Sequence, residues 1–241
     1  MTLQSLIQAI YPPQCVMCDA RTDVDFALCG PCWAETPFVT GLSCDGCGAP
    51  LPGQGEPEAG VLCDDCMTIA RPWSKGRAAL IYKDKTRRMV LSIKHGDRTD
   101  LTRAAGPWMA RAGRDLIGRD SLIVPIPLHR VRLLRRKFNQ AALLAQQIAL
   151  AADVQCLPDA LCRPKKTAPL EGHTLDQRFA ALSNAIYVHP KRPLAMKGRN
   201  VVLVDDVMTS GATFAAATEA CLKAGANDVC VLALACVVKD A

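Results

Sequence analysis

The chain has 241 residues, half of them hydrophobic, and a formal net charge of +6. A chain of this length can bury one large core and still carry a smaller second region. Its apolar segments are interrupted by charges, Pro or Gly, and its N-terminus lacks the basic and apolar parts of a signal peptide. We therefore expect no membrane insertion and a cytoplasmic location.

The charges are distributed unevenly along the chain. Residues 1–70 contain one Arg against nine acidic residues, whereas residues 75–139 contain seventeen Lys or Arg against five acidic residues. The rest of the chain from residue 140 is nearly balanced. The basic block predicts an anionic partner, with phosphate groups as the obvious class. A solvated helical surface is the ordinary alternative.

Apolar residues at positions 3, 6, 7 and 10 recur at helical spacing and predict a short amphipathic helix. Eight of the thirteen cysteines then form four C-x-x-C pairs. Two such pairs place four thiolates around one tetrahedral Zn²⁺, so the region predicts two structural zinc sites. Sequential and cross-braced pairing both remain open. The pairs are Cys15/Cys18, Cys29/Cys32, Cys44/Cys47 and Cys63/Cys66.

Other uses of the cysteine pairs fit less well. A reducing cytosol disfavours disulfides, redox C-x-x-C pairs usually occur singly, and paired knuckles suit zinc better than an iron–sulfur cluster. The favoured role of this region is a structural clip, because zinc supplies folding free energy to a segment too polar to form its own core. Its acidity argues against direct contact with nucleic acid.

Residues 71–241 predict an α/β domain with a mainly parallel sheet, separate from the cysteine-rich region 1–70. Gly106 and Pro107 interrupt the helical pattern of residues 100–113, which predicts a kinked or split helix. Cysteines outside the pairs are interpreted as core fillers; they are Cys156, Cys162, Cys221, Cys230 and Cys236. Strands are expected at residues 78–82, 122–124, 161–163 and 229–236, and helices at 83–93 and 138–152.

A basic cluster follows the strand expected at residues 122–124. In a strand, loop and helix layout this cluster lies at the carboxyl edge of the sheet, where open α/β folds bind ligands. It would neutralise a diphosphate or a nucleic-acid backbone, or it is simply a basic helix end. Its members are Arg130, Arg132, Arg135, Arg136 and Lys137.

Residues 164–182 are polar and have no steady period, which predicts a long loop. We interpret this loop as a flap that excludes water from an activated sugar. Lys165, Lys166 and Arg178 would then meet diphosphate charge when the flap closes.

The most informative segment is residues 201–213, V-V-L-V-D-D-V-M-T-S-G-A-T. An apolar run predicts a buried strand, with Asp205 and Asp206 at its end. A hydroxyl- and glycine-containing loop follows, and an alanine-rich helix is expected over residues 212–224. Free backbone N–H groups at such a helix N-terminus bind phosphate. Carboxylates beside a phosphate make sense if they accept hydrogen bonds from sugar hydroxyls or face a cation, so the segment predicts a sugar-phosphate site.

This segment resembles the 5-phosphoribosyl-1-pyrophosphate (PRPP) motif of type I phosphoribosyltransferases. The resemblance implies that Asp205 and Asp206 are the candidate catalytic residues and contact the ribose, with Mg²⁺ bound alongside PRPP. It also implies that the following loop wraps the 5-phosphate. That loop consists of Met208, Thr209, Ser210, Gly211, Ala212 and Thr213.

Nearly the whole chain resembles the ComF family, which includes the competence-associated ComF proteins and the GntX-type proteins. The resemblance rests on the four cysteine pairs, on residues 94–96, 124–128, 136–140 and 167–178, and on the acid motif. It implies a zinc-ribbon region joined to a type I phosphoribosyltransferase-like domain. The chain departs from the family at Lys137, where a glycine is usual, and at Leu170 and Ala181, where Gln and Asn are usual.

Two functions are consistent with this resemblance. The first is an enzyme that transfers phosphoribosyl from PRPP to an unidentified acceptor, releases pyrophosphate and takes part in DNA uptake. The second is a non-catalytic module that binds single-stranded DNA, alone or with DNA-uptake or recombination proteins, and whose PRPP site is regulatory or vestigial. The basic block supports the second function, whereas the scarcity of aromatic residues weakens it, since base stacking normally needs them.

Overall fold

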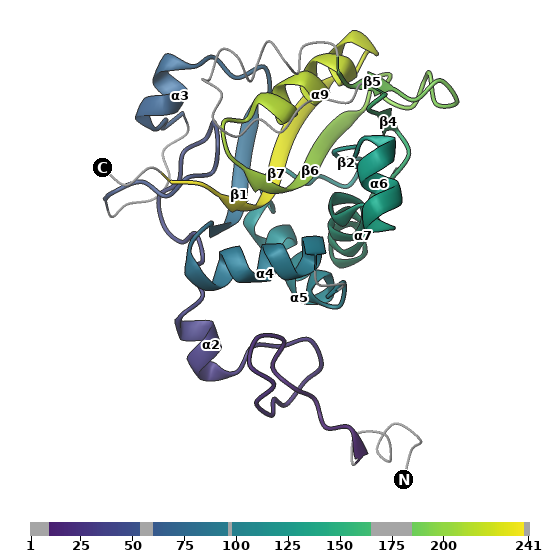
Figure 1. The fold of residues 1–241 in the computed structure, drawn as a ribbon. Coiled ribbons are helices and arrows are strands. Elements are labelled where there is room, and N and C mark those ends of the chain that lie inside the picture. The colour runs from purple at the N-terminus through teal and green to yellow at the C-terminus, as the bar shows by residue number, and fades with distance from the viewer. Residues whose placement is uncertain (1–9, 54–59, 96–97, 165–184, 239–241) are drawn as a thin grey trace.

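A computed structural model of the protein describes residues 10–53, 60–95, 98–164 and 185–238. Its central feature is a five-stranded sheet with the order β1-β7-β6-β2-β3, in which all neighbouring strands are parallel (Figure 1). β6 and β7 lie in the interior of this sheet and are apolar because both of their faces are covered. The strands are β1 (Lys75–Ile81), β2 (Leu122–Pro125), β3 (Gln155–Cys156), β6 (Asn200–Met208) and β7 (Asp228–Cys236).

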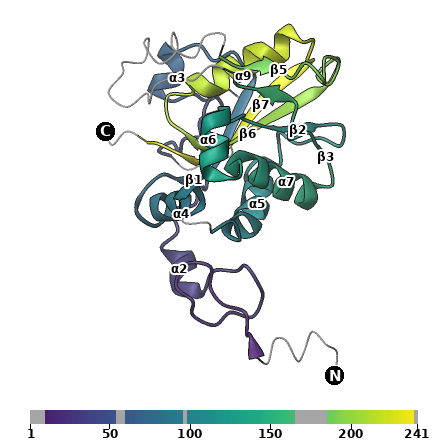
Figure 2. The same cartoon turned by 45° about the vertical axis from the view of Figure 1, so that its right-hand side comes forward.

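Helices cover both faces of the sheet (Figure 2). On one face, α4 (Asp84–His95), α5 (Leu101–Ala112) and α7 (Gln140–Ala152) share a core with alternate residues of β6 and β7. On the other face, α9 (Ala212–Lys223) packs on the remaining alternate residues. The predicted fold class, a mainly parallel α/β sheet flanked by helices with a small N-terminal cysteine-rich region, is confirmed.

Within its described residues, the cysteine-rich region has two short helices, α2 (Gly30–Ala34) and α3 (Asp64–Thr68). Its second half packs on β1 so closely that a Cβ at Gly48 would lie 2.3 Å from the Ala78 backbone nitrogen. Gly48 also has a φ of +74°, which favours glycine. The described residues before α2 extend away from the sheet beyond α4 (Figure 1). The domain boundary at residue 70 stays a prediction.

The segment around the acid motif differs from the prediction in one respect. β6 does not end before Asp205 but continues to Met208, because β7 is equally long and pairs with it as far as Met208 and Cys236. The acids therefore lie inside the strand. The helix that follows ends as predicted, with Lys223 as its last residue and Gly225 at a φ of +86°.

Three other predictions need correction. α5 is one continuous helix through Gly106 and Pro107, and its packing against α7 holds it together. Residues 161–163 do not enter the main sheet, because β4 (Leu161–Cys162) pairs antiparallel with β5 (Tyr187–Val188). The basic cluster forms a short helix of its own, α6 (Arg130–Arg136), and α7 begins at Gln140 after the Asn139 N-cap rather than at Phe138.

Two predictions about the remaining segments can be compared only in part. The expected opening helix lies almost wholly outside the described residues. The five cysteines expected as core fillers are free; three of them are buried and two are partly buried. Burial raises the pKa of Cys221 and Cys236 to about 12 and that of Cys156 to about 11, so these thiols stay neutral.

Within the described residues, no helix has both the length and the apolar character needed to cross a membrane.

Gly106→Ala should destabilise the protein, because the added Cβ would lie 2.3 Å from the Gln147 Cβ and push α5 away from α7. We expect a loss of about 1–3 kcal/mol in the free energy of unfolding, measured by urea denaturation. Gly30→Ala is the control, since nothing lies within 4 Å of the corresponding Cβ there. A Gly106→Ala protein as stable as the wild type would contradict this packing.

Candidate functional site

The acid pair occupies the second half of β6. Because Asp205 and Asp206 are consecutive strand residues, their side chains leave opposite faces of the sheet. Asp206 is 4% exposed, and its Oδ1 lies 3.1 Å from the Nζ of Lys94 in the last turn of α4. Its Oδ2 is buried and has no hydrogen-bond partner among the described residues. The two carboxylates are therefore not equivalent.

Asp205 is only partly buried and accepts a hydrogen bond of 2.8 Å from the backbone N–H of Asp206. Burial, and next the charge of Asp206, raise the pKa of the Asp205 carboxyl from 3.8 to about 7. Lys94 and Arg163 oppose this rise. Two carboxylates this close favour a ligand that brings positive charge or hydroxyl donors, because either one stabilises the doubly ionised pair. Oxygen ligands of this kind fit Mg²⁺.

The loop after β6 leads directly into α9. Gly211 is the N-cap of this helix, with a φ of +81°, and has no side chain to cap it; the Ser210 hydroxyl accepts a long hydrogen bond of 3.4 Å from the Ala212 N–H. Thr209 is exposed, and Ser210 and Thr213 are partly exposed. Three hydroxyls and the N-terminus of a twelve-residue helix therefore come together in one short segment. The Met208 and Ala212 side chains are buried in the core, so these two residues offer a ligand their backbone only.

The structure divides the basic cluster into two groups. Arg136 is partly buried and faces the acid pair. Burial lowers the pKa of its guanidinium, and the charges of Asp206 and Asp205 partly offset this lowering. Its Nη1 also donates to Gln140 Oε1 at 3.1 Å. The other members are exposed; they are Arg130, Arg132, Arg135 and Lys137. Only Arg136 of this cluster is both inward-facing and close to the carboxylates.

Lys137 departs from the family pattern at a position where the backbone explains the usual glycine. It is the C-cap of α6 and has a φ of +67°, in the left-handed region. Glycine adopts this conformation without a steric penalty, whereas other residues pay about 1 kcal/mol. The chain therefore keeps the backbone turn that the family glycine makes. The flap residues Lys165, Lys166 and Arg178 lie outside the described residues.

Sequence reasoning missed two basic residues of the site, Lys94 and Arg163. Arg163 is 8% exposed, forms a parallel bridge with His129, and lies close enough to Asp205 to affect its pKa. The sequence could have indicated Lys94, because this residue belongs to a family motif at the end of a predicted helix. It could not have indicated Arg163, since only the tertiary fold brings this residue to β6.

The eight paired cysteines form two separate clusters. Cys15, Cys18, Cys29 and Cys32 form one, and Cys44, Cys47, Cys63 and Cys66 form the other, with all sulfur atoms of a cluster within 4.8 Å of one another. The pairing is therefore sequential and not cross-braced. Four thiols at this spacing are the donor set of a structural zinc site, so the two clusters fit two zinc ions.

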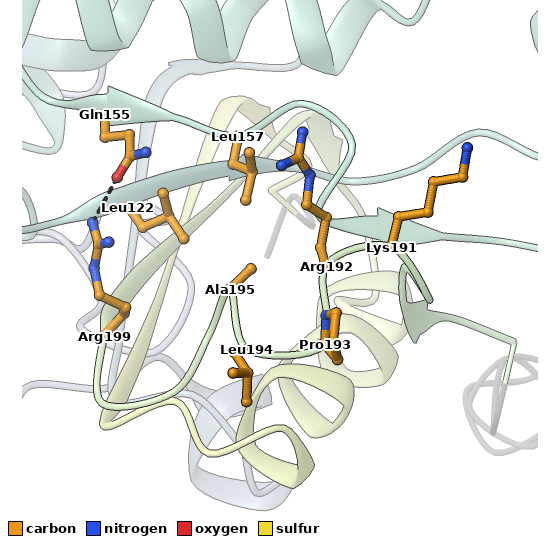
Figure 3. A pocket seen from close by; sticks show the side chains of 9 residues that line it. All are labelled: Leu122, Gln155, Leu157, Lys191, Arg192, Pro193, Leu194, Ala195 and Arg199. Atoms are coloured by element: carbon orange, nitrogen blue, oxygen red, sulfur yellow. Dashed lines mark hydrogen bonds between the residues drawn. The ribbon is translucent and has the colours of Figure 1, made fainter.

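The structure also has a cavity of about 370 Å³ that the sequence did not suggest (Figure 3). Leu122 and Gln155, which begin β2 and β3, line it together with Arg199, the residue before β6. It therefore lies at the amino ends of the strands, opposite the edge where parallel sheets bind ligands. None of the predicted site residues lines this cavity.

Comparisons with known proteins agree with this arrangement. The model of the double zinc ribbon domain matches residues 6–67. The DNA utilization protein YhgH of Escherichia coli is 28% identical over 87% of this chain and 90% of its own length. Competence protein F of Haemophilus influenzae is 28% identical over 72% of this chain and 77% of its own length.

A solved structure, the glutamine PRPP amidotransferase of Bacillus subtilis in complex with ADP and GMP, is 16% identical and covers 54% of this chain and 25% of its own. Its TM-score of 0.37 is too low to support an inference. The zinc-ribbon match, the relatives aligned over most of both chains and the acid motif on β6 all support the resemblance to the ComF family. The chain is similar to proteins named for competence and DNA utilization, and its N-terminal region is similar to the double zinc ribbon domain.

Proposed function

We propose that this protein binds PRPP together with Mg²⁺ at the carboxyl end of β6. The observation that supports this most directly is the continuity of one segment: two carboxylates in β6, then a hydroxyl-rich loop, then the N-terminus of α9. The carboxylates accept hydrogen bonds from the ribose hydroxyls, and the loop from Met208 to Thr213 holds the 5-phosphate. Cationic side chains surround the pair, which matches a ligand with phosphate at both ends.

The reaction proposed for this site is phosphoribosyl transfer. A nucleophile of an acceptor molecule forms a bond to C1 of the ribose, the bond from C1 to the pyrophosphate oxygen breaks, and pyrophosphate leaves with the electron pair. Bound Mg²⁺ supplies charge neutralisation for this leaving group. Arg136 and Arg163 add positive charge at the same edge, and Asp205 holds the sugar while positive charge develops on its ring. The names of the relatives support a role in DNA uptake or utilization.

A second candidate function is supported by the exposed face of α6. None of its residues is buried, and it presents arginines beside apolar side chains, including Leu134 at 81% exposure. Such a surface is suited to the backbone of single-stranded DNA. In that case the PRPP site would be regulatory or vestigial.

PRPP binding is tested by calorimetry with MgCl₂ on the wild type, on Asp205→Ala and on Asp206→Ala. We expect each substitution to weaken binding at least about 10-fold, because hydrogen bonds to charged groups contribute about 1.5–3 kcal/mol each. Asp228→Asn is the matched control, since Asp228 begins β7 at the opposite edge of the sheet. Equal affinities for the wild type and both site variants would refute the assignment of the acids.

The raised pKa of Asp205 predicts a pH dependence. Mg–PRPP affinity should increase as the pH rises through about 7, because the ribose contact needs the ionised carboxylate. PRPP itself titrates nearby, so the affinity ratio of wild type to Asp205→Asn is the quantity to follow, and it should grow between pH 6 and 8. An affinity ratio that stays constant between pH 6 and 8 would contradict the raised pKa of Asp205.

Because of the same pKa shift, Asp205 lowers the free energy of unfolding at neutral pH. The folded state keeps the proton between the ordinary pKa of 3.8 and about 7, where the unfolded state has lost it. Wild-type stability therefore falls across this range relative to Asp205→Asn. Thermal melts should show the advantage of the variant increasing from pH 5 to pH 8.

DNA binding by α6 predicts a salt dependence. The double variant Arg132→Gln/Arg135→Gln should bind a single-stranded oligonucleotide more weakly, and its slope of log K against log salt should be smaller by about 1.4. The control is Arg192→Gln/Arg199→Gln, which changes two arginines that line the cavity at the opposite edge. Identical slopes for all three proteins would exclude α6 as the DNA contact.

A further inference from the structure

Arg71 connects the second cysteine cluster to the loop before α9. Its Nη1 donates a hydrogen bond of 2.6 Å to the Ser210 carbonyl oxygen, in the middle of that loop. Its Nε lies 3.4 Å from the Cys66 sulfur, one of the four thiols of the cluster. One planar guanidinium therefore contacts a predicted zinc ligand and the predicted phosphate loop at once.

Trp73 makes a second connection between the same two parts. Its indole Nε1 donates to the Gly46 carbonyl oxygen at 2.6 Å, within the knuckle that carries Cys44 and Cys47. Its ring contacts Phe214 in the first turn of α9 edge-on, with centroids 6.2 Å apart. The Arg71 guanidinium lies 5.4 Å from the Trp73 ring centroid. The buried Trp73 ring, with the Arg71 guanidinium over it, thus links the cluster to the start of α9.

The bond from Arg71 also determines the direction of a backbone donor. A trans peptide is planar, and its C=O and N–H groups point in opposite directions. Because the Ser210 carbonyl points toward Arg71, the N–H of Gly211 points to the opposite side of the loop. This N–H has no acceptor among the described residues. It is therefore available to an anion at the N-terminus of α9.

Gly211 fits this arrangement closely. Its φ is +81°, and a Cβ at this position would lie 2.7 Å from Arg71 Nη1 and 2.9 Å from the Trp73 ring. The loop backbone is thus packed directly on the two side chains that connect it to the cysteine cluster. The Arg71 and Trp73 side chains therefore provide a direct path of contacts from the cluster to the Ser210–Gly211 peptide.

We propose that Arg71 is a positioning residue through which the Cys44, Cys47, Cys63 and Cys66 cluster orients the Gly211 N–H for phosphate. The proposal rests on the proposed function, in that the anion is the phosphate of a sugar phosphate. The second zinc ribbon then contributes to ligand binding as well as to folding. Because coupling between two sites is reciprocal, phosphate must protect this cluster from metal loss as much as the metal strengthens phosphate binding.

The affinity test compares Arg71→Met and Arg71→Lys with the wild type, using inorganic phosphate, ribose 5-phosphate and PRPP as separate calorimetric probes. Arg71→Met should weaken all three by about 10- to 100-fold, the range for one lost hydrogen bond to a charged group. Arg71→Lys should lose less, because lysine keeps the charge but lacks the planar fork that reaches both partners. Zinc content and circular dichroism establish that each variant is folded.

Arg77→Met is the matched control. Arg77 also contacts the second ribbon, through Asp45 at 2.7 Å, and it pairs with Asp115 at 2.8 Å. It makes no contact with the loop before α9 among the contacts of the described residues. Its loss should lower stability while changing phosphate affinity less than about 3-fold, which corresponds to under 1 kcal/mol.

The coupling test measures alkylation of individual cysteines by mass spectrometry in the presence of a chelator. Saturating inorganic phosphate should slow alkylation of Cys63 and Cys66 several-fold in the wild type but leave Cys18 and Cys29 unchanged. In Arg71→Met the protection should disappear. A purely structural role for Arg71 would lower stability without removing this dependence on phosphate.

The outcomes separate the two proposals. Unchanged phosphate affinity in Arg71→Met, or absence of phosphate protection in the wild type, would overturn the role of Arg71 while PRPP binding stands. A wild type that binds phosphate no more weakly than PRPP would overturn the proposed function, and the Arg71 variants would still decide the coupling. If the wild type binds none of the three probes, both proposals are wrong.

Discussion

The site depends on the placement of two adjacent carboxylates inside a central strand. β6 lies between β7 and β2, so neither acid can reach solvent as freely as it would from a loop. Desolvation disfavours the charged form of a carboxylate, and a second carboxylate beside it adds repulsion. Three basic residues supply positive charge near the pair: Lys94 from α4, Arg136 from α6 and Arg163 after β4. The asymmetry of the pair follows, because only Asp206 has a direct ion pair.

Local sequence patterns predicted the parts of the fold that local physics controls. The apolar runs of β6 and β7, the alanine-rich α9 and the spacing of the cysteine pairs each carry their signal within a few residues. The end of β6 was mispredicted because a charged pair normally marks a strand end, whereas pairing with the last residues of β7 extends the ladder past Asp206. Strand length was therefore decided by the neighbouring strand.

The contacts that define the site were mostly beyond sequence reasoning. Arg71 and Ser210 are 139 positions apart, and nothing near either residue indicates the other. Arg163 reaches Asp205 only because β4 leaves the main sheet, which a short apolar segment cannot reveal. Lys137 is the opposite case, since its left-handed backbone is what a family glycine at this position predicts. A departure in residue type thus left the backbone geometry intact.

The two cysteine clusters differ in how they are attached. Around the first, Lys85 of α4 lies 3.7 Å from the Cys32 sulfur and the Arg98 side chain donates to the Val16 carbonyl, while the Val16 side chain is buried in the core of the α4, α5 and α7 face. The second cluster shares the core of the α9 face, with Cys44 fully buried. Gly76 on β1 donates from its backbone to the Asp45 carbonyl oxygen, beside this cluster. Loss of a metal from the second cluster would therefore disturb β1 and the start of α9, whereas the same loss from the first would disturb the other face of the sheet, which α4, α5 and α7 cover. A metal at the second cluster would therefore stabilise the half of the fold that contains the candidate site, in addition to folding the ribbon itself.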